Sequence, residues 1–320
     1  MRKIALLTAA ALFAATTAAA QQPPGLPTPD PAAAAAMAEA QARFNALPDT
    51  PGTGPYPAIK EVVRALPNNT VYRPANLAAV EPGSLGVVAW GNGGCSPDGA
   101  SARQHLAEIA SHGYVVVAAG PILSGPGVPA RAPGSPEPAR TTSAQVMAGL
   151  DWALAENVRE GSPLFGLIDP KQVAVSGFSC GGVQAIDLAS DPRVTAVVLH
   201  NTGLFPAGPA LLPEMKSDKA WLDELHTPVL YIEGGPTDIA IENGMDDYAR
   251  INHVPVAMLN QDTGHGGNFM DVNGGAAAQA AVSWLAWQLR GDTEAARLFT
   301  GPNCGMCVST HWDYMSKNMD

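Results

Sequence analysis

One short stretch, residues 173–182 (Val-Ala-Val-Ser-Gly-Phe-Ser-Cys-Gly-Gly), constrains the fold of this chain more than any other. It opens with residues typical of a strand, and the amphipathic residues 183–189 that follow it predict a helix. Between them, Gly177 to Gly181 matches the G-x-S-x-G pattern, in which a sharp strand-to-helix turn exposes a serine beside the helix N-terminus. A chance match is the alternative, and the strand before and helix after count against it. The stretch therefore predicts Ser179 as a nucleophile.

Strand and helix patterns alternate along the rest of the chain. Residues 58–66 and 69–74 predict an antiparallel pair, and further strands are expected at 85–90, 114–119, 173–177, 194–200, 228–233 and 256–259. Long helices are expected at 101–112, 141–158 and 276–289. Continuously apolar strands such as 114–119 are typical of a sheet that is covered on both faces. The alternation predicts an α/β fold with a mostly parallel central sheet and helices on both faces.

The first twenty residues have the composition of an export signal. Residues 1–20 carry two early basic side chains, then an apolar run, then three alanines before Gln21. This order is typical of a secretory signal peptide and is too short and alanine-rich for a membrane-spanning helix. The sequence thus predicts a secreted or periplasmic protein.

The remaining chain divides into three parts. Residues 21–57 are rich in Pro and Ala and are expected to form an N-terminal arm on the surface, with a short helix around 32–47. Residues 58–290 suit one large catalytic domain. Residues 291–320 are expected to form a tail that lies beyond the core.

Charge and motif content exclude several classes of partner. The net charge is −11, and no basic patch is present that could neutralise phosphates, so a nucleic-acid partner is not expected. No later segment reads as a membrane span, and no cofactor or metal motif is evident. The tail carries Cys304 and Cys307 in a C-x-x-C pattern, but zinc would need two further soft ligands and only His311 is near. A small structural disulfide is the expected state.

A glycine-rich loop, residues 90–95 (Trp-Gly-Asn-Gly-Gly-Cys), follows a buried strand. Glycines there allow backbone N–H groups to face a common space, as in an anion-binding nest. Acyl transfer needs such donors for the oxygen that gains charge, and the N–H of Cys180, the residue after the nucleophile, is expected to be another. The alternative is a flexible turn between a strand and a helix.

Candidates for an acid and a base come later in the chain. Asp238 lies in a Gly/Pro turn just past a predicted strand, where a carboxylate can be held rigidly, and Glu233 is its rival. An ordinary surface aspartate is the alternative. His265 has glycines on both sides, which suggests that its ring lies close to other backbone.

The other histidines lack such a setting, with one exception. His200 ends a strand next to that of the nucleophile, so it is a candidate lining residue of a site. The rest are expected to be structural or solvated: His105 and His112 on a surface helix, His226 and His253 before strands, and His311 in the tail.

Taken together, these residues resemble the α/β-hydrolase superfamily. Ser179, Asp238 and His265 follow its chain order, and the loop 90–95 matches its oxyanion loop. The resemblance covers most of residues 58–290. It implies an α/β-hydrolase fold and a serine hydrolase in which Ser179 attacks a carbonyl, His265 moves the proton and Asp238 orients the imidazole.

Within that superfamily, the uninterrupted core resembles the branch of dienelactone hydrolases, polyester hydrolases and chlorophyllase-like esterases. This resemblance implies that the backbone N–H of Asn92 is the second oxyanion donor; Cys180 stands where methionine is usual in polyester hydrolases. No insertion is large enough for a lipase-type lid. A pocket roofed by residues 204–212 and floored by Trp90 and Phe178, with His200 nearby, would favour an apolar or aromatic acyl ester.

The oxyanion loop and the nucleophile turn each carry a cysteine. If Cys95 and Cys180 lie on two loops that converge on one oxygen, their Cα atoms come within the ~4.4–6.8 Å that a disulfide spans. Export to an oxidising compartment makes the bond available. We therefore expect a Cys95–Cys180 disulfide; two buried free thiols are the alternative.

The sequence analysis thus predicts a secreted serine hydrolase of carboxylic esters. Its partner would be a small-molecule or polymeric ester, and no oligomeric state is indicated. A peptidase or thioesterase on the same triad is an alternative, because a triad does not decide which acyl bond is cut. A second alternative is a non-catalytic binding protein of the same fold. The complete set of site residues counts against it, because a binding protein has no need to keep all of them.

Overall fold

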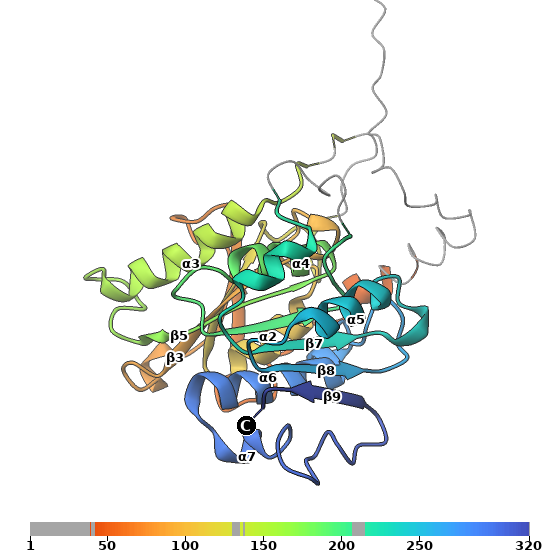
Figure 1. Ribbon diagram of the computed structural model, residues 1–320. Helices are drawn as coiled ribbons and strands as arrows, with labels where there is room; N and C mark the ends of the chain where they lie inside the picture. The colour runs from red at the N-terminus through yellow and green to blue at the C-terminus, as the bar shows by residue number, and fades with distance from the viewer. Residues whose placement is uncertain (1–38, 40–41, 130–134, 137, 207–214, 320) are drawn as a thin grey trace, which may run out of the picture.

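A computed structural model describes residues 39, 42–129, 135–136, 138–206 and 215–319 (Figure 1). The predicted signal peptide 1–20, most of the predicted arm helix and the pocket-roof residues 207–212 lie outside the described residues. Of the arm, residues 42–46 are helical, and residues 48–54 pack against helix α2 (Arg103–Ser111).

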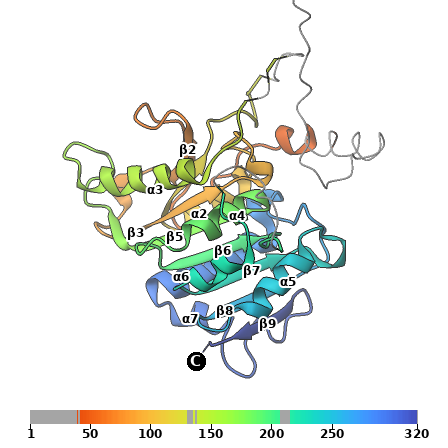
Figure 2. The same ribbon diagram turned by 45° about the horizontal axis from the view of Figure 1, so that its top comes forward.

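Nine strands form one sheet in the order β1-β2-β4-β3-β5-β6-β7-β8-β9, and Figure 2 shows β3, β5, β6, β7, β8 and β9 side by side. The strands are β1 (Ala58–Glu61), β2 (Asn69–Pro74), β3 (Leu85–Gly91), β4 (Tyr114–Ala119), β5 (Ile168–Phe178), β6 (Ala196–His200), β7 (Val229–Glu233), β8 (Val256–Asn260) and β9 (Asp313–Lys317). Neighbours from β4 to β8 are parallel, and β1, β2 and β9 pair antiparallel. The expected α/β fold with a mostly parallel sheet is confirmed.

Helices cover both faces of this sheet because side chains of successive strand residues point to opposite sides. One face packs against α3 (Ser143–Val158), α4 (Cys180–Leu188) and α5 (Ile241–Arg250). The other face packs against α2 and α6 (Gly275–Arg290), with the short helix α7 (Thr293–Ala296) beside α6. The parallel strands are almost wholly buried, as their continuous apolar sequences predict.

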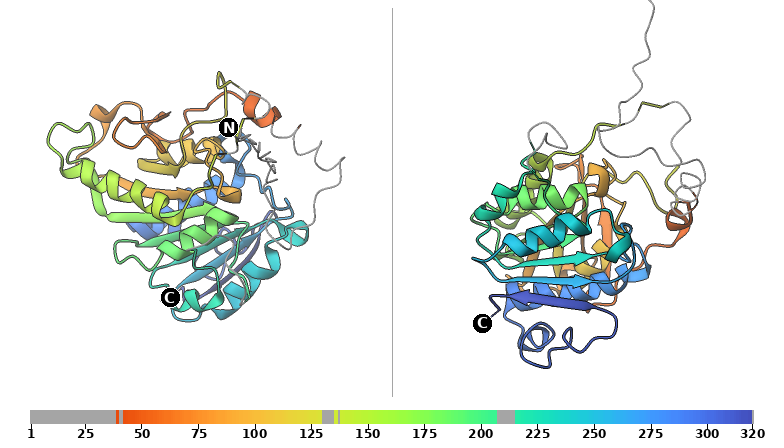
Figure 3. Two further views of the ribbon diagram at one scale, coloured as in Figure 1. Left: turned by 90° about the horizontal axis from the view of Figure 1, so that it is seen from above. Right: turned by 45° about the vertical axis from the view of Figure 1, so that its right-hand side comes forward.

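The C-terminal residues correct one expectation. The segment after α6 does not lie beyond the core, because β9 pairs with β8 and forms one edge of the sheet (Figure 3). Phe299 is buried and its ring contacts the rings of Trp284 and Trp287. The expected disulfide Cys304–Cys307 is present in this segment. The tail therefore completes the sheet and covers part of α6.

Helix α2 corrects a second expectation, since it is buried along its whole length. The arm covers it on one side, where Thr53 donates its backbone N–H to Glu108, and Gln279 of α6 donates to the same carboxylate from another side. Burial raises the pKa of Glu108, but hydrogen bonds from His112, Thr53 and Gln279 outweigh it and lower the pKa to about 2. His105 on this helix is wholly buried rather than exposed.

Candidate active site

Ser179 lies at the turn between β5 and α4, as the G-x-S-x-G pattern predicts. Its backbone has φ 52° and ψ −120°, a strained conformation for a residue with a side chain. The turn is tight enough that a Cβ atom on Gly177 would lie 2.1 Å from the carbonyl oxygen of Gly181. Gly177 is therefore required for β5 and α4 to meet, and a Cβ atom on Gly181 would instead lie 2.0 Å from the carbonyl of Gly91 at the end of β3.

His265 connects Ser179 to Asp238. Its Nδ1 lies 2.6 Å from Oδ1 of Asp238, and its Nε2 lies 3.0 Å from Oγ of Ser179. Because a carboxylate only accepts hydrogen bonds, Nδ1 carries the proton and donates to Asp238. In the neutral ring Nε2 is then free to accept the hydrogen of the Ser179 hydroxyl. The structure thus brings the three residues singled out in the sequence into one hydrogen-bonded chain.

The Asp238 carboxylate is buried and fully occupied by donors. Oδ1 also accepts the N–H of Ala240 at 2.9 Å, and Oδ2 accepts the N–H of Gly234 at 3.0 Å and the side-chain amide of Asn201 at 2.7 Å. Burial raises the pKa of Asp238, but the hydrogen bonds from His265, Ala240 and Asn201 outweigh it and leave the pKa below its ordinary value. The residue is therefore a stable carboxylate beside the imidazole.

Glu233, the rival acid, does not contact His265. It is buried at the end of β7, and Oε1 accepts the N–H of Thr202 at 3.3 Å. Burial and the nearby charge of Asp238 raise its pKa well above the ordinary value. Glu233 is thus a buried carboxyl group behind Asp238 that holds its proton more tightly than an ordinary glutamate.

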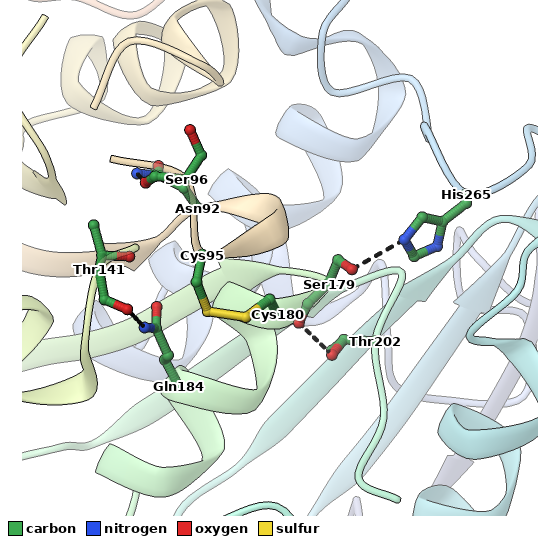
Figure 4. The surroundings of a disulfide bond; sticks show 9 residues. All are labelled: Asn92, Cys95, Ser96, Thr141, Ser179, Cys180, Gln184, Thr202 and His265. Carbon is green, nitrogen blue, oxygen red and sulfur yellow. Dashed lines mark hydrogen bonds between the residues drawn. A yellow bond between two sulfur atoms is a disulfide. The ribbon is translucent and has the colours of Figure 1, made fainter. Parts of the chain in front are cut away.

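The expected Cys95–Cys180 disulfide is present, with Cα atoms 5.3 Å apart. Figure 4 shows it on the other side of Ser179 from His265. The bond joins the glycine-rich loop after β3 to Cys180, the first residue of α4. Backbone N–H groups in the first turn of a helix have no hydrogen-bond partner within the helix. The disulfide therefore places the loop directly beside the nucleophile turn.

Two backbone N–H groups lie free beside this turn. Within the described residues, neither the N–H of Cys180 nor that of Asn92 donates a hydrogen bond. The Asn92 side chain is used instead to hold the loop, donating to the carbonyls of Ser96 and Ala119 and accepting from the indole of Trp90.

Only one of the three expected pocket residues reaches the site surface. Phe178 is partly exposed, and its ring centroid lies 5.3 Å from that of His265. Trp90 and His200 are wholly buried, which corrects their assignment as lining residues. Both side chains point to the α2 and α6 face of the sheet, where they form an aromatic cluster with His105 and Phe269.

Sequence reasoning missed the residue pair that follows β6. The side chains of Asn201 and Thr202 contact the site, whereas His200 contacts it only through its backbone carbonyl, which accepts the N–H of Ser179: Asn201 binds Asp238, and the Thr202 hydroxyl donates to the carbonyl oxygen of Ser179 at 2.8 Å. The sequence feature that could have identified them is their position, because both residues follow the carboxyl end of a strand that neighbours the strand leading to Ser179. Within the described part of the chain, no group of three or more His, Cys, Asp or Glu is arranged to hold a metal ion.

No protein-family model and no curated protein matches this chain. Over the residues that the structure describes, no helix has both the length and the apolar character needed to cross a bilayer.

Proposed function

We propose that this chain is a serine hydrolase of the α/β-hydrolase superfamily that cleaves carboxylic esters through an acyl-enzyme. The observation that carries the proposal is the bridge of His265 between Ser179 and Asp238, at 3.0 Å and 2.6 Å. A serine within reach of a base, which is in turn oriented by a third group, is the arrangement of an activated nucleophile.

In the proposed reaction, the Ser179 hydroxyl attacks the ester carbonyl while Nε2 of His265 takes its proton. The negative charge that develops on the carbonyl oxygen is stabilised by the free N–H groups of Asn92 and Cys180. His265 then gives the proton to the leaving alcohol. Water, deprotonated by the same imidazole, releases the acid from the acyl-enzyme. Asp238 stays ionised throughout and keeps the imidazole in the tautomer that Ser179 needs.

The acyl bond and the cellular setting are parts of the same proposal. The resemblance to lidless esterases favours esters over amides, and the partly exposed Phe178 ring beside His265 favours an apolar or aromatic acyl group. Two disulfides fit an oxidising compartment, which agrees with export directed by residues 1–20. A peptidase or thioesterase would use the same machinery on another acyl bond.

Hydrolysis of a panel of p-nitrophenyl esters of rising chain length, with an aromatic ester and a polyester film, tests this function. We expect the parent protein to hydrolyse part of the panel and Ser179→Ala to lose at least about 10³-fold in rate. The variant should keep the parental melting temperature to within a few degrees, which shows that the fold is intact. Near-parental activity of Ser179→Ala would contradict the proposal.

A further inference from the structure

The residue pair Asn201–Thr202 contacts both halves of the candidate site. Asn201 follows β6 with φ 47°, a left-handed conformation that asparagine tolerates better than most residues. Its side-chain amide donates to Oδ2 of Asp238 at 2.7 Å and to the carbonyl oxygen of Gly264 at 3.1 Å. One amide group therefore holds both the acid and the backbone directly before His265.

Thr202 holds the nucleophile side. Its hydroxyl donates to the carbonyl oxygen of Ser179 at 2.8 Å, the contact drawn in Figure 4. A Cβ atom on Gly182 would lie 2.4 Å from the Thr202 methyl carbon, so this side chain also packs directly against α4. The Thr202 N–H is in turn bound by the buried carboxyl group of Glu233.

We propose that Asn201 and Thr202 are positioning residues that set the distance between His265 and Ser179. Ser179 and His265 are 86 residues apart in the chain and belong to separate loops. Asn201 and Thr202 directly follow the end of β6, and between them they bind both loops. A displacement of either loop would therefore break a hydrogen bond to one of these two residues. This role goes beyond the triad and rests on the proposed hydrolase function.

Asn201 also affects the charge on Asp238. Two charged or titratable groups face that carboxylate, His265 in front and Glu233 behind, and the uncharged amide of Asn201 donates to the same carboxylate. Without this amide the carboxylate loses a donor and binds the protonated imidazole more tightly. Loss of Asn201 should therefore change the pH at which activity appears as well as its maximum rate.

The experiment compares two matched pairs of variants in p-nitrophenyl ester hydrolysis and in the rate of Ser179 labelling by a fluorophosphonate. Asn201→Gly keeps the left-handed backbone and removes the amide, and Asn201→Asp keeps the shape and replaces the donor by a carboxylate. Thr202→Val removes the hydroxyl at nearly constant volume, and Thr202→Ser retains it.

We expect Asn201→Gly to lower kcat about 10- to 100-fold with KM changed less than about threefold, as for loss of a hydrogen bond to a charged group. The acid limb of its pH profile should move to higher pH, and further in Asn201→Asp. Thr202→Val should lose about 3- to 10-fold in kcat, and Thr202→Ser should retain the parental rate.

A lower kcat with an unmoved acid limb would show that Asn201 has only a structural role, and parental kcat in Asn201→Gly would overturn its role altogether. Equal rates for Thr202→Val and Thr202→Ser would overturn the role of Thr202. If the Asn201 variants do not fold, the comparison of these two Thr202 variants still tests the positioning role. A parent that neither hydrolyses esters nor reacts with the probe contradicts the proposed function itself. An active parent with variants that match it contradicts the positioning role alone.

Discussion

The two halves of the candidate site are held together by different means. The nucleophile half consists of Ser179, the loop after β3 and the start of α4, and it is held by close backbone contact and by the Cys95–Cys180 disulfide. The acid–base half consists of Asp238 and His265 on the loops after β7 and β8, and it is held by hydrogen bonds to a buried carboxylate.

This difference indicates how each half responds to change. A disulfide and backbones in direct contact allow few alternative positions. The geometry of the nucleophile half should therefore change when the disulfide is reduced or when one of its glycines is replaced. Hydrogen bonds to a buried charge depend on each donor and on pH, because an unpaired buried carboxylate is costly.

Replacement of the acid should have the largest effect. Asp238→Asn keeps the shape of the side chain but presents the wrong tautomer of His265 to Ser179, so kcat should fall about 10⁴-fold, the scale seen when a triad carboxylate of a serine protease becomes an amide. Glu233→Gln is the matched control, since Glu233 is buried and accepts its hydrogen bond from Thr202, whereas His265 binds Asp238. Steady-state kinetics of both variants would measure the ranking. A reversed ranking would make Glu233 the triad acid.

Removal of the site disulfide should have an intermediate effect. In the double variant Cys95→Ser, Cys180→Ser, the loop keeps a link to α4 through Thr141, whose backbone N–H donates to the Cys95 carbonyl and whose carbonyl accepts a hydrogen bond from the Gln184 side chain. We expect kcat to fall about 10-fold with KM nearly unchanged, since the lost order affects contacts made in the transition state.

The tail disulfide is the control for that variant. Cys304 and Cys307 are three positions apart, whereas Cys95 and Cys180 are 85 apart. Loop-closure entropy then predicts a stability loss of about 4–5 kcal/mol for the site disulfide and about 2 kcal/mol for the tail disulfide. Denaturant unfolding measures both losses. Equal kcat values for the two double variants would show that the site disulfide does not order the oxyanion donors.

The aromatic cluster beneath both halves should affect stability but not rate. Burial lowers the pKa of His105 to about 3, and burial together with the neighbouring His105 lowers that of His200 well below its usual value. Both rings are neutral in the folded protein, whereas in the unfolded chain they take up protons below about pH 6.5. The contribution of His105 to stability is thus fully present above that pH and is lost as the pH falls toward about 3, by at most about 1.4 kcal/mol per pH unit, and His200 acts in the same direction.

The variant His105→Phe tests this assignment, since phenylalanine is aromatic and does not titrate. Thermal unfolding of the variant between pH 6.5 and 3.5 should show a shallower loss of stability than the parent, and ester hydrolysis at pH 8 should be within a few-fold of parental. An identical pH dependence would mean that His105 is already protonated in the fold.

Local patterns predicted the parts of the site that depend on backbone geometry. Ser179 was identifiable because its strained turn requires glycines on both sides, and Asp238 because a Gly/Pro turn follows β7. The Cys95–Cys180 bond followed from the expectation that two loops converge on one oxygen. In each case the sequence near the residue contains the physical requirement.

Other features depend on contacts between distant residues. His200 was expected at the site, but a shift of one position at the end of a strand reverses the side chain, so Asn201 is there instead. Helix α5 was missed because Gly244 and several charges interrupt its pattern; Gly244 lies against Glu233, where a Cβ atom would come 2.7 Å from Oε1. Strand β9 is short and only partly buried, and its partner β8 precedes it by more than fifty residues.

The most direct test of the account is covalent labelling of the native protein by a fluorophosphonate, followed by peptide mapping. If His265 activates Ser179, one equivalent of probe should attach to Ser179, and Ser179→Ala should remain unlabelled under the same conditions. Asp238→Asn should be labelled far more slowly than the parent, and Glu233→Gln at close to the parental rate. Absence of labelling at Ser179 in the folded parent, or labelling that persists in Ser179→Ala, would contradict the account.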